Sequence, residues 1–182
     1  MKRTTFAGWP CSIARTIDLL GDWWTPLVLR EALYGTTRFD DFERVLRIGR
    51  NVLSQRLNRL VDAGILERVP YQNHPPRYDY RLTDMGRDVF PVLAAIARFG
   101  DQWLAGTDGP PVILHHTTCQ HDTQAEVVCS HCRQPLRLGD ITPLLGPGYP
   151  ARHRAAALAT GRFGPSQPHS PPNADPVEIS TV

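Results

Sequence analysis

Two pairs of metal-binding side chains have the same spacing in the second half of the chain. Cys129 and Cys132 are separated by two residues, as are His116 and Cys119, and nine residues lie between the pairs. Three thiolates and one imidazole form a typical tetrahedral zinc set. A segment too small for its own core would gain its stability from the metal. We therefore predict a closed, structural zinc site in a zinc-ribbon-like segment over residues 112–138.

The assignment of these side chains leaves alternatives open. Three other histidines compete with His116 as the fourth ligand: His115, His121 and His131. Cys129 and Cys132 could instead form a reversible disulfide, or remain inert thiols. The four cysteines of the chain are too few and too unevenly spaced for a disulfide framework.

Cys11, the remaining cysteine, stands at the start of the first predicted helix. Free N–H groups and the helix dipole at that end favour a thiolate, which would suit redox sensing. A small buried side chain at a subunit interface is the alternative, because free cysteine is among the most buried residue types. The sequence supports both interpretations.

A second set of side chains suits the recognition of DNA bases. Segment 50–63 has helical spacing, with Leu53, Leu57 and Leu60 on one side. The other side carries hydrogen-bonding groups at Arg50, Asn51, Ser54, Gln55 and Asn58, with Arg59 close to it. Arginine pairs with guanine, and Asn or Gln with adenine, in a major groove wide enough for a helix. Arg56 lies nearer the leucine side, where it would brace the fold or contact phosphate.

The pattern after Gly64 changes to that of a β-hairpin. Two strands, 65–71 and 78–82, flank a turn that contains two prolines. Arg77 follows these prolines, which stiffen the turn and would present its charge to a phosphate or a narrow minor groove. His74 is either a polar turn residue or a second DNA contact.

The other elements frame this helix and hairpin. Helical spacing predicts a first helix over 13–20, then helices that start at caps supplied by Thr25 and Thr37. Thr83 is predicted to cap one long final helix that continues to Trp103. In this order the elements define a winged helix-turn-helix, mainly α with a small β-hairpin wing (α+β).

Composition divides the chain into three parts. Residues 1–108 are periodic and rich in apolar side chains, and we expect them to form the DNA-binding and dimerisation domain. Residues 112–138 hold the predicted metal site. Residues 139–182 are rich in Pro, Gly, Ala and Ser, and we predict that they are largely disordered, because they can bury little apolar surface.

Charge and motifs narrow the function classes. The net charge is only +2, but the segment between positions 38 and 81 contains nine arginines and only six acidic residues. The sequence lacks an apolar run long enough for a bilayer and a secretory signal, so a cytoplasmic location is expected. It also lacks a phosphate-cradling glycine loop and a nucleophile elbow, so catalysis is not expected.

Six signatures in unbroken order closely resemble the HxlR-type regulators, which are relatives of the MarR group. They are CSIARTIDLLGDWWT (11–25), LREALYG (29–35), RFDDF (38–42), LSQRL (53–57), GIL (64–66) and PRYDYRLT (76–83) with Gly86. The resemblance covers roughly residues 11–104 and implies a dimeric winged-helix repressor or activator. It further implies a subunit interface made by the first and last helices, and a short inverted-repeat operator on double-stranded DNA. Some relatives use a cysteine at the position of Cys11 as a switch.

One departure from the family concerns the tryptophans. Family members often have lysine at the position of Trp23, which here stands beside Trp24. The two rings would pack into the core or the dimer interface. A ligand pocket lined by Trp23, Trp24 and Trp103 is the alternative.

A protein-interaction module that keeps the winged fold without DNA binding is the competing function, because folds are reused freely. The polar face with Arg50, Asn51 and Gln55 argues against it, because a protein-binding surface more often presents aromatic anchors. A zinc hydrolase would need an open coordination position, which four protein ligands exclude.

Overall fold

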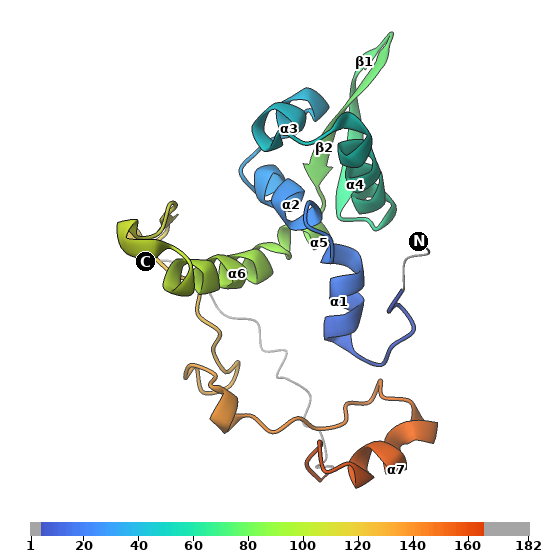
Figure 1. Cartoon of the computed structure of the whole chain (residues 1–182), viewed down its shortest axis with the longest axis vertical. Coiled ribbons are helices and arrows are strands. Elements are labelled where there is room, and N and C mark those ends of the chain that lie inside the picture. Colours follow the sequence, from blue (N-terminus) through green and yellow to red (C-terminus); the bar gives the residue numbers. More distant parts are fainter. Residues whose placement is uncertain (1–4, 166–182) are drawn as a thin grey trace. The chain divides into compact units, whose positions relative to one another are not determined.

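The computed structural model describes residues 5–165, which form two compact units: the first ends at Ala125 and the second begins at Glu126. The first unit contains the winged helix-turn-helix (Figure 1). Its helices and wing are α1 (Ser12–Leu20), α2 (Thr25–Leu33), α3 (Phe39–Leu46), α4 (Arg50–Asp62), β1 (Leu66–Asn73), β2 (Pro76–Leu82), α5 (Asp84–Arg87) and α6 (Phe90–Trp103). A short 3₁₀ turn, η1 (Gly106–Asp108), and a small hairpin, β3 (Leu114–His116) and β4 (His121–Thr123), follow.

The core lies where α2, α3, α4 and the base of the wing meet. The three leucines of α4, Leu53, Leu57 and Leu60, are fully buried against it. The other buried core residues are Val28, Leu29, Ala32, Phe42, Ile48, Ile65 and Leu66. Each fully buried leucine contributes roughly 1.5–3 kcal/mol relative to exposure, so this side of α4 fixes how the helix is presented.

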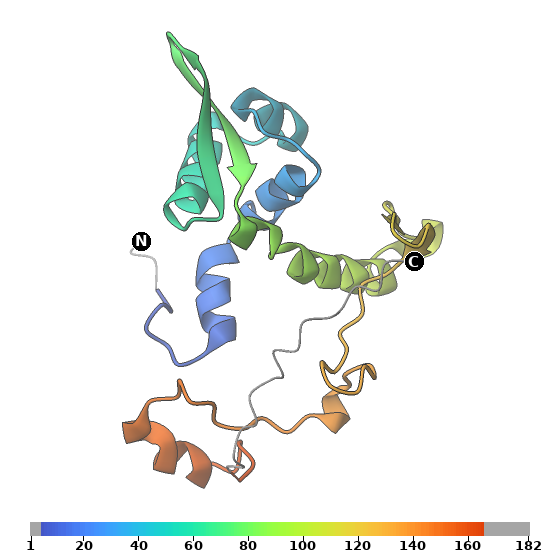
Figure 2. The ribbon, with the colours of Figure 1, turned by 180° about the vertical axis from the view of Figure 1, so that it is seen from behind.

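The wing is a twisted antiparallel pair. Its register runs from Leu66 opposite Leu82 to Asn73 opposite Pro76, with an irregularity between Pro70 and Gln72. Both views show its tip extending beyond α3 and α4 (Figures 1 and 2). The tip is therefore available to a partner that also contacts α4.

Two glycines connect α4 to the wing and α5. Gly64 ends α4 with a φ of +72°, a conformation that favours glycine. Gly86 of α5 packs so closely that an added Cβ would lie 2.2 Å from the carbonyl oxygen of Ile65. A larger residue at position 86 would displace the wing from α5.

Two of the three predicted helix caps were wrong. Thr83 caps as expected, because its Oγ1 accepts the N–H of Gly86 at 3.1 Å. Thr37 instead bonds Asp79 of the wing, at 3.3 Å, and α3 begins at Phe39 without a side-chain cap. Thr25 is the first residue of α2, and its own N–H is bonded by Asp22.

The prediction of a single long final helix was also wrong. The chain forms α5 and then α6, with a break at Asp88 and Val89. Pro91 explains the break, because proline has no N–H to donate and its ring clashes with the preceding turn. Proline is tolerated at the first turn of α6, where it stands.

The second unit begins at Glu126 and contains η2 (Leu138–Asp140) and α7 (Ala151–Ala159). Leu145 and Ala157 are buried within it. The structure therefore differs from the disorder predicted from residue 139 onward, since α7 is a regular helix. Residues 166–182 of that predicted tail lie outside the described residues. No helix in the described part of the chain has the length and apolar character to cross a membrane.

Candidate nucleic-acid interface

The polar side of α4 faces away from the core. Arg50, Asn51 and Gln55 are exposed, and Ser54 and Asn58 are half-buried. Gly49 precedes the helix and offers no side-chain cap, so the first N–H groups of α4 are open to an anion. The side chains predicted to read bases therefore lie on the side of α4 that is turned away from the core.

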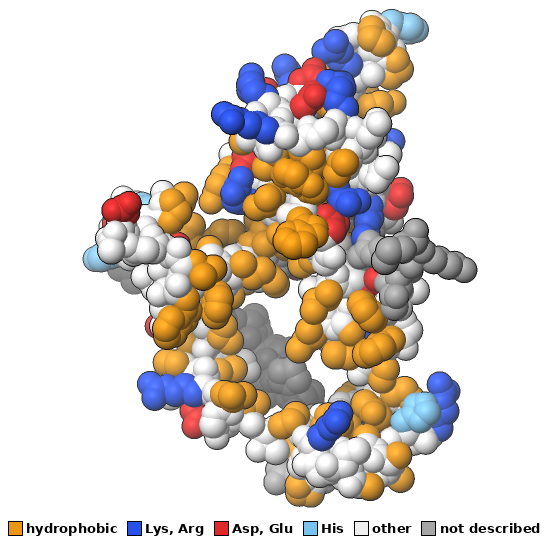
Figure 3. All heavy atoms as spheres, viewed as in Figure 1, with side chains coloured by type: hydrophobic (Ala, Val, Ile, Leu, Met, Phe, Trp, Pro, Cys, Tyr) orange, Lys and Arg blue, Asp and Glu red, His pale blue; other side chains and the backbone are white. Residues whose placement is uncertain are grey.

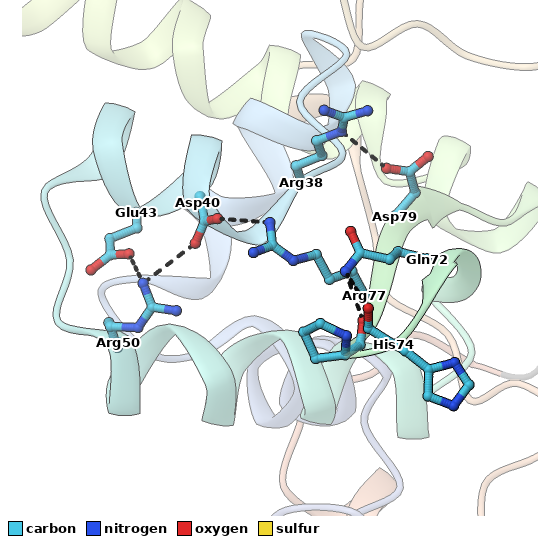
Figure 4. A network of polar contacts seen from close by, with 9 residues as sticks. Arg38, Asp40, Glu43, Arg50, Gln72, His74, Arg77 and Asp79 are labelled. Atoms are coloured by element: carbon cyan, nitrogen blue, oxygen red, sulfur yellow. Dashed lines mark hydrogen bonds and ion pairs between the residues drawn. The ribbon is translucent and has the colours of Figure 1, made fainter.

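Arg50 is held at the start of this face by acidic residues of α3. Its Nη1 lies 2.5 Å from Glu43 Oε2 and 3.4 Å from Asp40 Oδ1 (Figure 4). Its guanidinium also stacks over Phe39, 4.8 Å from the ring centroid. Exposed ion pairs are worth about 1 kcal/mol or less, so a base or phosphate can displace these carboxylates.

The wing tip presents its own arginine toward the same carboxylate. Arg77 Nη1 lies 4.0 Å from Asp40 Oδ2, and its side chain is about half exposed. Gln72 Nε2 donates to the carbonyl oxygens of His74 and Pro75, at 3.1 Å each, which braces the turn (Figure 4). The His74 side chain is exposed at this turn.

A polar hollow of about 310 Å³ lies between the wing and the two helices. It is lined by Phe39, Asp40, Arg50, Tyr71, Pro75, Pro76, Arg77, Tyr78 and Tyr80. Figure 3 shows arginine side chains gathered over α3, α4 and the wing, with acidic side chains among them. The surface is therefore rich in arginine, and several of its arginines form ion pairs with acidic side chains of the same surface.

Arg38 belongs to this surface and was not among the predicted site residues. Its guanidinium stacks over Tyr71 of the wing, 4.8 Å from the ring centroid, and its Nε lies 3.8 Å from Asp79 Oδ1. The side chain remains 59% exposed and so keeps a charge available to phosphate. Only the local excess of arginine signalled it, because Tyr71 and Asp79 are distant in the sequence.

Arg56 and Arg59 do not belong to the exposed face. Arg56 Nε donates to Asp22 Oδ1 at 2.8 Å, as the bracing interpretation expected. Arg59 Nη2 donates to the backbone carbonyl of Asp18 in α1. The two guanidinium groups therefore hold α4 against α1 and the turn before α2 instead of extending from the exposed face. Asn58 accepts a hydrogen bond from Arg68 of β1.

Asp22 organises the start of α2. Its carboxylate accepts the N–H groups of Trp24 at 2.9 Å and Thr25 at 3.0 Å, the Thr25 hydroxyl, and Arg56 Nε. Burial acts to raise the pKa of Asp22, but the hydrogen bonds from Thr25 and Trp24 and the Arg56 charge outweigh it. The pKa therefore lies below its ordinary value of 3.8.

The Asp22→Ala variant is expected to lose about 2 kcal/mol of unfolding free energy, because the cap and the Arg56 partner disappear together. Since the pKa is lowered on folding, the carboxylate stabilises fully above pH 4 and ceases to do so as pH falls through the folded pKa. The difference from wild type should therefore shrink below about pH 4. Urea unfolding at pH 7 and pH 3 measures it. Asp84→Ala is the control, because the Asp84 carboxylate is 97% exposed. Equal urea midpoints of unfolding for the two variants would contradict this role of Asp22.

Two of the three tryptophans predicted to line a pocket are largely exposed. Trp24 packs against the core, whereas Trp23 is 92% and Trp103 67% exposed. An apolar cavity of about 230 Å³ lies instead between α2 and α6, lined by residues that include Leu33, Tyr34, Phe90 and Leu93. The predicted tryptophan pocket was wrong for Trp23 and Trp103, because rings so exposed do not enclose a ligand.

The cysteines occupy distinct local environments. Cys11 is half-buried at the start of α1, where its Sγ accepts the N–H of Ala14 at 3.5 Å. Backbone N–H groups of Cys132 and His131 lower the pKa of Cys129. Among residues 5–165, no three His, Cys, Asp or Glu side chains lie together as a ready metal-binding group. The zinc site therefore remains a prediction.

These elements define a class of protein. Two helices, α3 and α4, are joined by a tight turn, α4 presents a polar face, and a two-stranded wing follows. The first unit is therefore a winged helix-turn-helix domain of the kind that binds DNA.

Comparisons with known proteins identify the family. Residues 19–108 match the model of the HxlR-like helix-turn-helix family. The chain is 41% identical over 141 residues to Rv3095 of Mycobacterium tuberculosis, an uncharacterized HTH-type transcriptional regulator; this covers 78% of the chain and 89% of that protein. A second such regulator, sll1512 of Synechocystis, is 39% identical over 95 residues, covering 52% of the chain and 70% of that protein.

Similar solved structures are also those of proposed transcription factors. PA1607, a proposed transcription factor, matches with a TM-score of 0.68 and 33% identity, over 76% of this chain and 96% of that one. PA1374 of Pseudomonas aeruginosa, also a proposed transcription factor, matches with a TM-score of 0.58 and 36% identity, over 80% and 99%. The chain belongs to the HxlR-like helix-turn-helix family, and it is a DNA-binding transcriptional regulator rather than an enzyme.

Proposed function

We propose that this regulator binds an inverted-repeat operator as a homodimer, with each α4 in a major groove and each wing on the neighbouring backbone. One observation carries this proposal: the polar side of α4 is exposed directly opposite three leucines with no exposed surface. Because the buried leucines prevent α4 from turning about its own axis, its hydrogen-bonding groups point outward. The major groove is the surface that reads such groups.

The N-terminal half of α4 would read the bases. Arg50, Asn51 and Gln55 are its exposed members, and recognition helices contact base edges mainly through their N-terminal residues. Ser54 and Asn58 are half-buried and would add contacts at the side of the groove. The open N–H groups at the start of the helix would bind a phosphate at the groove edge.

The wing and Arg38 would supply backbone contacts. Arg77 and His74 lie at the tip of the wing, and Arg38 is fixed beside it by Tyr71. Phosphate contacts position a protein without carrying sequence information. These residues are therefore assigned to affinity rather than to specificity.

Arg77→Ala tests this assignment. With two Arg77 side chains in a dimer, the slope of log affinity against log salt concentration should become shallower by about 1.8, at about 0.9 for each phosphate that is no longer neutralised. Operator and random DNA should be weakened alike. Fluorescence anisotropy over a salt series measures both, and Arg77→Lys should retain the wild-type slope. An unchanged slope in Arg77→Ala would show that the wing does not touch DNA.

The dimer interface is assigned to α1 and α6, as the family resemblance implied. No residue of α1 is buried, although Ile13 and Ile17 belong to it, and α6 buries only Ala94. The exposed apolar side chains of α6 and the residue after it are Phe90, Val92, Ile96, Phe99, Trp103 and Leu104. Figure 3 shows hydrophobic side chains over both helices. An apolar surface this extensive needs a partner that covers it.

A groove between the two helices suits a second copy of the chain. It has a volume of about 480 Å³ and is lined by Ile13, Ile17 and Leu20 of α1 and by Val92 and Ile96 of α6, among others. Two-fold pairing through this face makes both α4 helices equivalent. The operator would then be an inverted repeat whose half-sites lie about one helical turn apart, roughly 34–36 Å.

Cys11 would connect this interface to a redox signal. Cys11 is the N-cap residue of α1, so its thiol lies directly before residues of the proposed interface. Oxidation would place a larger or charged group there and change how the two subunits pack. This role of Cys11 is a prediction that a Cys11→Ser variant tests, since its DNA affinity should no longer respond to oxidant.

A further inference from the structure

Arg50, the first residue of α4, has both of its carboxylate contacts on the same nitrogen of its guanidinium group. Its Nη1 lies 2.5 Å from Glu43 Oε2 and 3.4 Å from Asp40 Oδ1 (Figure 4). Among residues 5–165, no hydrogen bond or ion pair involves Nε or Nη2 of Arg50. One part of the guanidinium group is therefore held, and another is open.

The open part is an edge that can pair with guanine. The five N–H donors of arginine form a planar, rigid fork, in which the N–H groups of Nε and Nη2 lie along one edge. Bidentate pairing with guanine O6 and N7 needs two such neighbouring donors. Guanine can therefore bind the Nε–Nη2 edge of Arg50 without displacing either carboxylate from Nη1. The side chain is exposed, so a base can reach this edge.

The ring of Phe39 sets the plane of the same guanidinium group. Arg50 Cζ lies 4.8 Å from the centroid of this ring, whose face attracts a cation. Phe39 is the first residue of α3, and it is half-buried and packs against the core. The ring limits the tilt of the guanidinium group, and the two carboxylates limit its direction within the plane. Arg50 is therefore oriented by three side chains of α3.

The turn between α3 and α4 brings these side chains to the start of α4. Asp40 and Glu43 are three residues apart and so lie on the same face of α3. The helix ends at Arg47, which has a left-handed φ of +50°. Ile48, the next residue, is buried in the core and fixes the turn. Glu43 and Arg50 meet because the chain reverses here.

Asp40 also contacts the wing. Its Oδ1 faces Arg50, whereas its Oδ2 lies 4.0 Å from Nη1 of Arg77 in β2. All three residues line the polar hollow between the wing and the two helices. One carboxylate thus lies between an arginine assigned to base reading and an arginine assigned to phosphate.

Folding stability does not explain these acidic side chains. Asp40 is exposed and Glu43 half-buried, and ion pairs in such positions contribute little to stability. Acidic groups beside a DNA-binding surface also repel the phosphate backbone, which weakens binding to any duplex. Orientation of Arg50 before DNA arrives is a gain that offsets this repulsion, because a side chain that is already ordered loses less entropy on binding.

We propose that Glu43 and Asp40 are positioning residues that hold Arg50 by its Nη1 and present its Nε–Nη2 edge to guanine. This role rests on the proposed function, in which α4 enters the major groove. Sequence preference then depends on two acidic side chains that need not contact DNA themselves.

The Glu43→Ala variant of the full-length chain tests this role. Fluorescence anisotropy measures its affinity for an operator selected from random DNA and for a random duplex of equal length. The ratio of the two affinities should fall at least about fivefold, because DNA would then have to immobilise two Arg50 side chains per dimer. The ratio is the readout because loss of a negative charge tightens both complexes. A ratio equal to that of the wild type would overturn the proposal.

Asp41→Ala is the matched control for charge. It removes the same charge from the same helix, but Asp41 pairs with Arg44 at 2.6 Å and not with Arg50. Its affinity ratio should equal that of the wild type. An equal fall in Asp41→Ala and Glu43→Ala would show that the charge of α3 matters rather than the contact with Nη1, and would overturn the positioning role.

Two further variants of these acids separate geometry from charge. Glu43→Gln keeps an oxygen that can accept a hydrogen bond from Nη1, so it should recover most of the ratio lost in Glu43→Ala. Asp40→Ala should lower the ratio in the same direction as Glu43→Ala. A ratio in Glu43→Gln as low as in Glu43→Ala, or a ratio in Asp40→Ala above that of the wild type, would contradict positioning.

The Arg50→Ala background distinguishes this role from the proposed function. With Arg50 removed, Glu43→Ala should not change the affinity ratio any further, and a further fall would overturn the positioning role. If Arg50→Ala alone leaves the ratio unchanged, base reading by Arg50 fails and the positioning role fails with it. If Arg50→Ala lowers the ratio and Glu43→Ala does not, only the positioning role fails.

Discussion

Replacement of Ile17 by aspartate is expected to give a folded monomer that binds operator DNA at least about a hundredfold more weakly than wild type. Ile17 is 51% exposed on α1 and lines the groove shared with α6. In the proposed dimer, a carboxylate there would be transferred into an apolar interface, which costs several kcal/mol unless it is paired. Each half-site would then be bound separately, without the gain in affinity that comes from linking two DNA-binding domains.

Sedimentation velocity and fluorescence anisotropy on the same samples measure both effects. Val127→Asp is the matched control, because Val127 is 59% exposed and lies outside α1 and α6. It should remain dimeric with unchanged affinity. A dimeric Ile17→Asp protein with wild-type affinity would show that α1 is not the interface.

The Arg50→Ala variant is expected to bind its operator at least about 30-fold more weakly, because the dimer loses two bidentate contacts to guanine, each worth about 1–3 kcal/mol. Binding to random DNA should change much less. The fold should be retained, since the ion pairs of Arg50 with Asp40 and Glu43 are exposed and contribute little to stability.

Arg87→Ala provides the control for charge. Arg87 is 62% exposed on α5, pairs with Asp84, and lies away from the polar face of α4. Its loss should leave operator affinity within about twofold of wild type at physiological salt, because distant exposed charges are screened. An equal loss of affinity on operator and random DNA in Arg50→Ala would place that residue on phosphate and contradict base reading.

The winged domain could be predicted from the sequence because its signals are local and repeated. Leu53, Leu57 and Leu60 recur at helical spacing, and Gly64 ends the helix, so both the buried side and the exposed side of α4 follow. The hairpin was predictable from its alternation and its prolines. The cap at Asp22 was missed because Thr25 with Pro26 resembles a cap and first turn, and only the folded geometry shows which oxygen accepts the N–H groups.

The residue types of the DNA-binding face could be predicted, but their partners could not. Arg50 meets Asp40 and Glu43 because the turn between α3 and α4 brings the two helices together. Arg38 meets Tyr71 only because the wing folds back past the start of α3. Such contacts depend on tertiary packing, which helical or strand periodicity does not specify.

The region after residue 139 shows the limit of composition as a guide. Its average content of Pro, Gly and Ser suggested disorder, yet Ala151–Ala159 forms α7. Five of these nine residues are alanine, the strongest helix former, and no glycine or proline interrupts them. A local run of favourable residues outweighed the average of the whole region.

Selection of bound sequences from random DNA, performed in parallel with wild-type protein and Arg50→Ala, tests the central assignment most directly. We predict that the wild type enriches an inverted repeat and that Arg50→Ala enriches the same repeat with preference lost at one symmetry-related position in each half-site. Enrichment of an identical repeat by both proteins, or of no repeat by the wild type, would contradict the insertion of this face of α4 into the major groove.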